Sequence, residues 1–207
     1  MKQIEDFVVK ALHHQNIINM VLDIIKNRWS PYSFSQEPIE DYKLKEIIEA
    51  AGYAPSSMNE QPWLFILTTK HEPEIFNKVI DILDDGNKVW AKNAYALIVS
   101  LARMKHKYKD RPNRYAFHDT GMAVSNMLLQ AFSMDIYVHQ MGGFSAEKAK
   151  NYFRLDDGIE PVAVMAVGYK GDGKELSEEL ARRDNNRRPR KHISEYLFRN
   201  NLNNPVS

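Results

Sequence analysis

The chain has 207 residues, of which 43% are hydrophobic and 27% charged, a composition that suits one folded domain and excludes a mainly disordered chain. Lysine and arginine total 28 against 27 aspartate and glutamate, so the formal net charge of +1 creates no overall field that would draw the chain to nucleic acid or anionic lipid. The absence of cysteine excludes disulfides, thiolate catalysis, cysteine-ligated zinc and iron–sulfur clusters, so any redox chemistry must use a bound cofactor.

Apolar residues at helical spacing predict the first elements of the chain. The pattern over residues 4–26 indicates one or two amphipathic helices, which we interpret as an N-terminal helical extension, residues 1–26. A second stripe over residues 39–51 predicts a helix that Gly52 and Pro55 end. No apolar run approaches the roughly 18 residues of a membrane span, and charges interrupt the N-terminus where a signal peptide needs a continuous apolar stretch. We therefore expect a cytoplasmic protein with no membrane partner.

The middle of the chain mixes strand and helix patterns. Apolar runs predict strands buried on both faces over residues 63–69, 96–101 and 161–169, and a short strand over residues 136–140. Helical spacing predicts helices over residues 74–83 and 115–134, with Ser145 as the N-cap of another. The helix over 115–134 has little polar face, which is typical of a core or a dimer interface. The order lacks the regular βαβ alternation of a Rossmann domain. The stretch 170–207 is predicted to be a basic C-terminal arm of the same domain.

Several short motifs have plainer explanations. Residues 168–174 fit the spacing of a phosphate-binding G-x-x-x-x-G-K loop, but Glu175 stands where the loop needs a hydroxyl for Mg²⁺, so a turn-rich exit from a strand is favoured. His13 and His14 are adjacent and point apart on a helix, and no metal-ligand spacing occurs, so no metal site is predicted. For His118 and Asp119, a local hydrogen bond is favoured over acid–base chemistry.

Two polar stretches are better candidates for a binding site. Arg28 and Ser30 follow a helix and could offer a bidentate donor and a second donor to a phosphate, the alternative being a solvated helix end. Residues 54–63 place two prolines, two hydroxyls and two amides between a helix and a strand. Such a rigid loop presents several donors and acceptors at the edge of a sheet.

Together with four further motifs, these stretches resemble the nitroreductase family of FMN-dependent oxidoreductases. The pieces are R-x-S, A-P-S-S-x-N-x-Q-P-W, G-N-x-x-W, D-x-G-x-A, H-Q-M-G-G-F and a hydrophobic strand that ends in glycine, and they occur in this order between about residues 24 and 189. The resemblance implies an α+β fold with a mainly antiparallel central sheet flanked by helices. It also implies an intertwined homodimer with two FMN sites between the subunits.

The resemblance assigns roles to individual residues. Arg28 and Ser30 are implied to lie on the phosphate and ribityl side of FMN, where Arg187 closes on the phosphate. The loop 55–59 is implied to reach the flavin of the partner subunit, and the backbone of residues 141–143 to pass its N5 atom. The implied cofactor-binding residues are Arg28, Trp29, Ser30, Tyr32, Pro55, Ser56, Ser57, Asn59, Asn87, Gln140, Met141, Gly142, Gly143, Arg187 and Arg188, and the candidates that line the substrate site are Trp90, Phe144 and Tyr32.

The implied activity is hydride transfer from NAD(P)H through flavin N5 to a nitroaromatic, quinone or similar small acceptor, by a ping-pong mechanism. The cofactor performs this chemistry, so no catalytic side chain is assigned. The chain departs from the family at two positions. Many members carry a cation in place of Tyr32, and some carry one in place of Trp90; these cations stabilise the anionic reduced ring. A tyrosine hydroxyl supplies a hydrogen bond but no charge, so this stabilisation is weakened.

Two other functions remain open at this point. One is a flavin-binding storage or regulatory protein without turnover. The other is a nucleic-acid binder that uses the cations of residues 182–191. This basic run lacks interleaved aromatic residues for base stacking, so we favour a phosphate clamp and expect no nucleic-acid partner.

Overall fold

Within residues 21–107 and 111–206, which the computed structural model describes, the chain forms a four-stranded antiparallel sheet in the order β1-β2-β4-β3. The strands are β1 (Trp63–Thr69), β2 (Ala96–Arg103), β3 (Ile136–Met141) and β4 (Ile159–Tyr169). All three strand pairs are antiparallel. The prediction of a mainly antiparallel α+β fold is therefore confirmed. The predicted helices of residues 1–20 lie outside the described residues.

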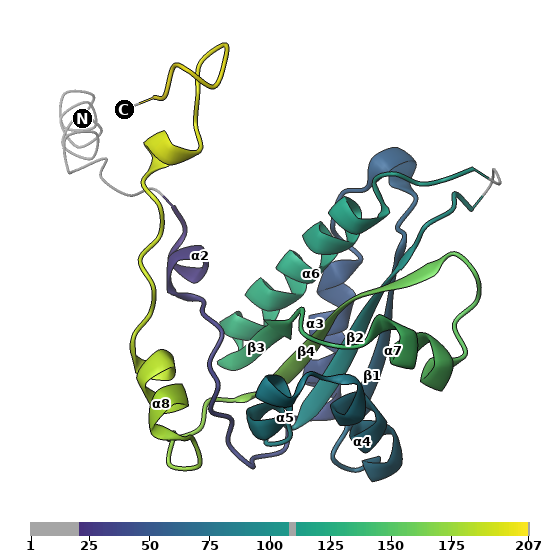
Figure 1. Ribbon diagram of the computed structural model, residues 1–207, viewed down its shortest axis with the longest axis vertical. Coiled ribbons are helices and arrows are strands. Elements are labelled where there is room, and N and C mark those ends of the chain that lie inside the picture. The colour runs from purple at the N-terminus through teal and green to yellow at the C-terminus, as the bar shows by residue number, and fades with distance from the viewer. Residues whose placement is uncertain (1–20, 108–110, 207) are drawn as a thin grey trace, which may run out of the picture.

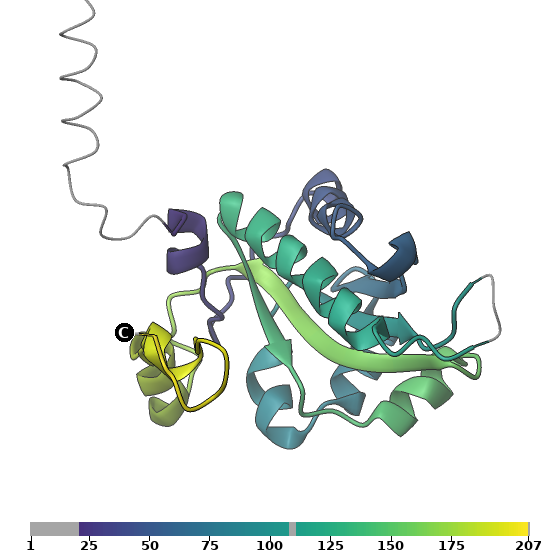
Figure 2. The same ribbon diagram turned by 90° about the horizontal axis from the view of Figure 1, so that it is seen from above.

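Helices cover both faces of the sheet (Figure 1). Side chains alternate along each strand, so Leu97 and Val99 of β2 join the core on one face, while Ile98 joins the core on the other. The first core is shared with helices α4 (Pro73–Ile82), α5 (Asp85–Ala91) and α7 (Ala146–Phe153). The second core is shared with α3 (Asp41–Ala51) and α6 (Ala116–Ser133). Figure 2 shows the same sheet from above, with α6 lying across it.

The predicted strand burial holds for the centre of the sheet but not for its edge. Strands β2 and β4 are buried over most of their length, as predicted. Strand β1 pairs only with β2 among the described residues, and Leu64 is 36% exposed. The prediction that β1 is buried on both faces is wrong for this chain, because an edge strand has a neighbour on one side only.

Before the C-terminal arm, helix positions agree with the sequence patterns, with one omission. Helices α3, α4 and α6 lie where the apolar stripes predict them, and Ser145 caps α7 by accepting a hydrogen bond from the backbone N–H of Lys148. The seven-residue helix α5 is not predicted by the sequence, because so short a segment shows no clear apolar period.

The segment that resembles a phosphate loop is a packed turn after β4. The hydroxyl of Ser33 donates to Glu175 at 2.7 Å and accepts from the backbone N–H of Gly173 at 2.9 Å. A Cβ atom at Gly171 would lie 2.3 Å from the hydroxyl oxygen of Ser33. Gly171 thus serves close packing, which agrees with the turn-rich interpretation.

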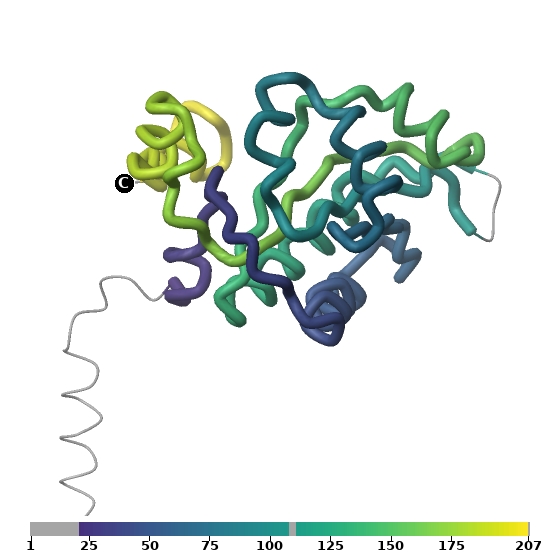
Figure 3. Tube along the Cα trace, turned by 90° about the horizontal axis from the view of Figure 1, so that it is seen from below, coloured from purple at the N-terminus to yellow at the C-terminus, as the bar shows by residue number. Residues whose placement is uncertain are grey.

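The two ends of the described chain lie side by side, away from the sheet (Figures 1 and 3). The N-terminal part carries α2 (Asp23–Asn27), and the predicted arm contains α8 (Glu178–Asn185) and a short 3₁₀ helix, Ile193–Glu195. The backbone N–H of Tyr32 donates to Asp184 at 2.6 Å, and Arg187 donates to the carbonyl of Asn27 at 3.2 Å. In the described part of the chain, no helix is long and apolar enough to cross a membrane.

Candidate functional site

A pocket of about 480 Å³ lies between the N-terminal segment and the C-terminal arm. Residues from three parts of the chain form it: the segment after α2, strand β3 and the end of α8 with the residues that follow. The lining residues are Lys26, Arg28, Trp29, Ser30, Tyr32, His139, Arg183, Asn186, Arg187, Arg188 and Arg190. The structure thus brings together six of the predicted cofactor-binding residues, Arg28, Trp29, Ser30, Tyr32, Arg187 and Arg188.

The pocket is strongly cationic. Nη1 of Arg28 donates to the hydroxyl of Ser30 at 3.3 Å, so both groups face the same space. Burial is the main cause that lowers the pKa of the Arg28 guanidinium, and repulsion from Arg190 and Arg187 lowers it further. Like charges held this close repel each other until an anion enters between them. The pocket is therefore suited to a phosphate or another dianion.

Trp29 orders the cations at one side of the pocket. The guanidinium carbon of Arg187 lies 4.4 Å from the centroid of the Trp29 ring, and Nζ of Lys170 lies 5.0 Å from it. Both distances are typical of cation–π contacts. Because Arg187 also donates to the carbonyl of Asn27, its side chain is fixed at two points before any ligand binds.

His139 is a pocket residue that the sequence reasoning missed. Its Nδ1 atom lies 2.8 Å from the carbonyl oxygen of Pro31, and its ring centroid lies 4.8 Å from that of Tyr32. Burial is the main cause that lowers the pKa of His139. The H-Q-M-G-G-F motif begins at this residue, which is the sequence signal that could have identified it.

The structure places Trp90, predicted to line a substrate site, in the core of the described chain. Its side chain is 1% exposed. Its ring centroid lies 5.2 Å from that of Tyr32, 6.3 Å from that of Phe34 and 4.4 Å from that of His139. An indole enclosed by these rings has no surface left for a substrate in the described chain.

The glycines after β3 lie against α5. The side-chain amide of Asn87 and the backbone N–H of Asp84 both donate to the carbonyl of Gly143, each at 3.0 Å. A Cβ atom at Gly143 would lie 2.7 Å from a carboxylate oxygen of Asp84 and 3.0 Å from the amide nitrogen of Asn87, so a larger residue there would displace these two side chains. Asn87 and Gly143, both implied to bind the cofactor, therefore meet, whereas a Cβ atom at Gly142 would have open space around it.

The other predicted residues of this region differ in exposure. Met141 is buried, Gln140 is exposed, and Phe144 is half-buried. Phe144 packs against the core on the α4 side and forms an isolated bridge with Leu83. None of these three residues lines the cationic pocket. Their predicted contacts with a flavin and a substrate stay predictions.

The loop that carries Pro55, Ser56, Ser57 and Asn59 lies far from the cationic pocket of the same chain. It follows α3 and precedes β1, whereas the pocket lies beside α2 and α8, and Figures 1 and 2 agree on this separation. Within one chain, therefore, the two predicted halves of the cofactor site do not meet.

The same loop has an unusual backbone. Met58, Asn59 and Gln61 have φ angles of 56°, 54° and 49°, in the left-handed region of backbone conformation that residues other than glycine rarely adopt. Each such residue costs on the order of 1–3 kcal/mol and persists only where surrounding contacts impose it. Strain of this kind concentrates at binding sites, so the loop is a functional candidate on its own geometry.

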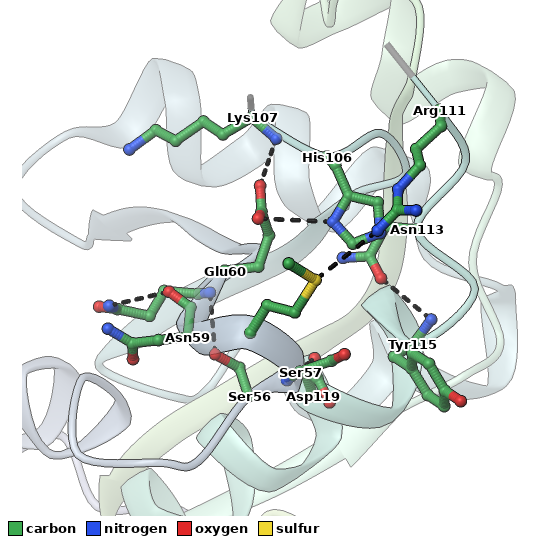
Figure 4. Close-up of polar contacts among 12 residues, drawn as sticks. Ser56, Ser57, Asn59, Glu60, His106, Lys107, Arg111, Asn113, Tyr115 and Asp119 are labelled. Carbon is green, nitrogen blue, oxygen red and sulfur yellow. Dashed lines mark hydrogen bonds and ion pairs between the residues drawn. The ribbon is translucent and has the colours of Figure 1, made fainter. Parts of the chain in front are cut away.

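Two carboxylates hold the loop in place (Figure 4). Asp119 of α6, which is 2% exposed, accepts a hydrogen bond of 2.9 Å from the backbone N–H of Ser57. Glu60 accepts from the backbone N–H of Lys107, and its other oxygen lies 3.4 Å from Nδ1 of His106. The hydrogen bond from Lys107 is the main cause that lowers the pKa of Glu60. Asp119 therefore does more than form the predicted local bond to His118, which it also makes at 3.0 Å.

Within the described ranges, no cluster of three or more histidine, aspartate or glutamate side chains could hold a metal ion. What this site can do chemically is bind: the pocket offers cations and hydroxyls, and the residues near Gly143 offer a close backbone approach.

Comparisons with known proteins agree with this geometry. The chain matches the nitroreductase family over residues 25–169. It is 33% identical over 133 residues to an uncharacterised 15.4 kDa protein of Mycolicibacterium smegmatis, covering 64% of this chain and 88% of that protein. It is 31% identical over 162 residues to a protein of Archaeoglobus fulgidus with the provisional name NADH dehydrogenase/NAD(P)H nitroreductase, covering 76% of this chain and 89% of the relative.

A solved structure is similar over most of the fold. It is described as an oxidoreductase containing FMN, and it is 28% identical to this chain. The similarity covers 90% of this chain and 95% of that one, with a TM-score of 0.83.

Proposed function

The chain belongs to the nitroreductase family, and from this premise we propose that it is an FMN-dependent oxidoreductase that uses NAD(P)H as its hydride donor. The observation that carries the proposal is the cationic pocket that Arg28, Ser30 and Arg187 form. The similar solved oxidoreductase contains FMN, and the Archaeoglobus relative is named for NAD(P)H, which supports both the cofactor and the donor.

The residues of the pocket fit the phosphate end of FMN. Guanidinium groups match a phosphate with two parallel donors, and the neighbouring Ser30 hydroxyl adds another. Because Arg190 and Arg187 repel Arg28 in the free protein, a phosphate dianion removes this repulsion on binding. Arg28, Ser30 and Arg187 would hold the phosphate, with Arg188 and Arg190 adding positive charge at the rim.

The residues after β3 fit the ring end. Bound FMN supplies a group that accepts and donates hydride at N5. The chain supplies a backbone that a flat ring can approach closely, since neither Gly142 nor Gly143 carries a side chain and the space beside Gly142 is open. Asn87 fixes this backbone by donating to the carbonyl of Gly143, so its role would be to position the segment as well as to face the ring.

We propose that the active unit is a homodimer in which the loop around Ser57 reaches the pocket of the partner subunit. Two observations support this arrangement. The first is that the loop has a strained backbone, which Asp119 and Glu60 hold in place. The second is that the loop lies far from the pocket of its own chain. A site shared between two copies uses both features.

The proposed reaction is a ping-pong exchange in which NAD(P)H and the acceptor visit the same site in turn. Nitroaromatics, quinones and similar flat acceptors fit a site beside a flat ring, with Phe144 and Tyr32 as candidate lining residues. Neither side chain is assigned an acid or base role. The chain's contribution is to bind, orient and exclude, while the cofactor carries the electrons.

The visible absorption spectrum of the purified protein is the first test. We expect bound oxidised flavin, and steady-state oxidation of NADH or NADPH when a quinone is added. A folded protein that stays colourless after incubation with excess FMN would overturn the proposal. Flavin that is bound but reduced by neither nucleotide would indicate a storage or regulatory protein in place of an enzyme.

A further inference from the structure

We propose that His139 is a cofactor-binding residue, whose Nε2 atom accepts a hydrogen bond from a hydroxyl group of the ribityl chain of FMN. The inference deepens the proposed function and rests on it. It starts from the environment of the imidazole, which lies in the wall of the cationic pocket.

The partner of Nδ1 fixes the tautomer of the ring. The carbonyl oxygen of Pro31, 2.8 Å away, can only accept, so Nδ1 must carry the hydrogen. Burial lowers the pKa of the imidazole and so favours its neutral form; the cation Arg28 acts in the same direction, and the hydrogen bond to Pro31 and the charge of Asp184 oppose it. In a neutral ring with hydrogen on Nδ1, Nε2 has a lone pair and no hydrogen. Nε2 is therefore an acceptor only.

This acceptor is available for a ligand. Among the described residues, the polar contact of His139 is the one through Nδ1, and Nε2 makes no hydrogen bond. The imidazole packs against both Tyr32 and Trp90, with ring centroids 4.8 Å and 4.4 Å away. These contacts hold the ring in one orientation before the ligand arrives, which reduces the entropy lost on binding.

The acceptor complements the rest of the pocket. The guanidinium groups of Arg28, Arg187, Arg188 and Arg190 are donors only. The hydroxyl oxygen of Ser30 can accept, but it already does so from Arg28. Donors of this kind suit a phosphate, whereas a polyol also needs acceptors for its hydroxyl hydrogens. A neutral Nε2 supplies one.

Position selects the ribityl chain over the ring. His139 lines the same pocket as the phosphate-binding cations, while Asn87 and Gly143, where the ring is proposed to lie, do not line it. In FMN the ribityl chain joins the phosphate to the ring. The part of the ligand that extends from the phosphate site toward the ring is therefore the part that passes His139.

The test is a thermodynamic cycle that compares FMN dissociation constants after removal of the imidazole, of one ribityl hydroxyl, or of both. The variant His139→Phe keeps a flat ring and removes the acceptor, and the ligands are FMN and its 2′-, 3′- and 4′-deoxyribityl analogues. Dissociation constants come from quenching of flavin fluorescence. We expect His139→Phe to weaken FMN binding about 3- to 10-fold, the effect of one neutral hydrogen bond. We also expect one of the three analogues to bind the variant as tightly as FMN does, although it binds the original protein more weakly.

Controls separate this inference from other outcomes. The variant His71→Phe changes an exposed histidine outside the pocket and should leave all four dissociation constants unchanged. Any packing defect in His139→Phe affects FMN and its analogues alike, so the ratio of their constants within the variant remains informative. If each deoxy change weakens binding to the variant as much as binding to the original protein, the hydrogen bond does not exist. If the original protein does not bind FMN at all, the proposed function itself fails.

Discussion

The backbone N–H of Ser57 and the carboxylate of Asp119 are joined by a hydrogen bond of 2.9 Å, although 62 positions separate them in the chain. Asp119 lies in the first turn of α6, where the helix dipole also favours a negative charge. The bond ties the strained loop after α3 to the longest helix of the described chain, so the loop's shape depends on a residue outside it.

Replacing Asp119 by alanine is expected to lower the free energy of unfolding by about 1–3 kcal/mol, because the part-buried N–H of Ser57 loses its partner. Asp119→Asn keeps one acceptor oxygen and should cost less. Urea denaturation measures both effects, with Asp157→Asn as an exposed control. Hydrogen exchange at the Ser57 amide should speed up in Asp119→Ala. Unchanged exchange there would show that the bond does not hold the loop.

Trp90 tests whether the indole belongs to the core. Because it is 1% exposed and enclosed by Tyr32, Phe34 and His139, Trp90→Ala should lower the free energy of unfolding by about 3–5 kcal/mol. Trp90→Phe retains most of the apolar contact and remains measurable if the alanine variant does not fold. If both variants were as stable as the original protein, Trp90 would not be part of the core, and its predicted place in a substrate site would be favoured.

Arg28 tests the phosphate end of the pocket. Loss of a charge-assisted hydrogen bond to a phosphate costs about 1.5–3 kcal/mol, so Arg28→Ala should raise the FMN dissociation constant roughly 10- to 100-fold. Arg182→Ala is the matched control, since Arg182 is an exposed arginine of the same arm that does not line the pocket. Equal affinities for the two variants would contradict the assignment of Arg28.

A mixed dimer tests whether the loop serves the partner. One subunit carries Arg28→Ala and the other carries Asn59→Ala, with different affinity tags for purification. If the loop crosses between subunits, one site receives both changes and the other receives neither, so about one FMN per dimer should remain tightly bound. If the loop serves its own chain, each site is damaged once and tight binding is lost at both.

The elements that the sequence predicts well are those with a clear period. The stripe of α3 and the β-branched run of β1 follow directly from residue spacing, because side-chain direction in a helix or strand depends on local geometry alone. The edge position of β1 could not be predicted, since it depends on which strands pair. Helix α5 is too short to show a period, and the same segment carries Trp90, whose burial only the packed rings reveal.

The candidate site divides in the same way. Its N-terminal and glycine motifs can be recognised along the chain, because they are contiguous. Spacing alone could not show that His139 faces the pocket, since the interaction with Pro31 joins residues 108 positions apart. For Asp119 the sequence predicts only a local bond, because the sequence shows only its neighbours along the chain. The fold brings Ser57 to it.

The pocket draws its residues from opposite ends of the described chain, with Lys26, Arg28 and Ser30 on one side and Arg183, Arg187 and Arg190 on the other. During synthesis the first group leaves the ribosome before the strands of the sheet, and the second leaves after β4. A nascent chain that has already formed its sheet still lacks four of the six lysine and arginine side chains that line the pocket. An anionic ligand would therefore meet the full set of pocket cations only after the arm has been translated.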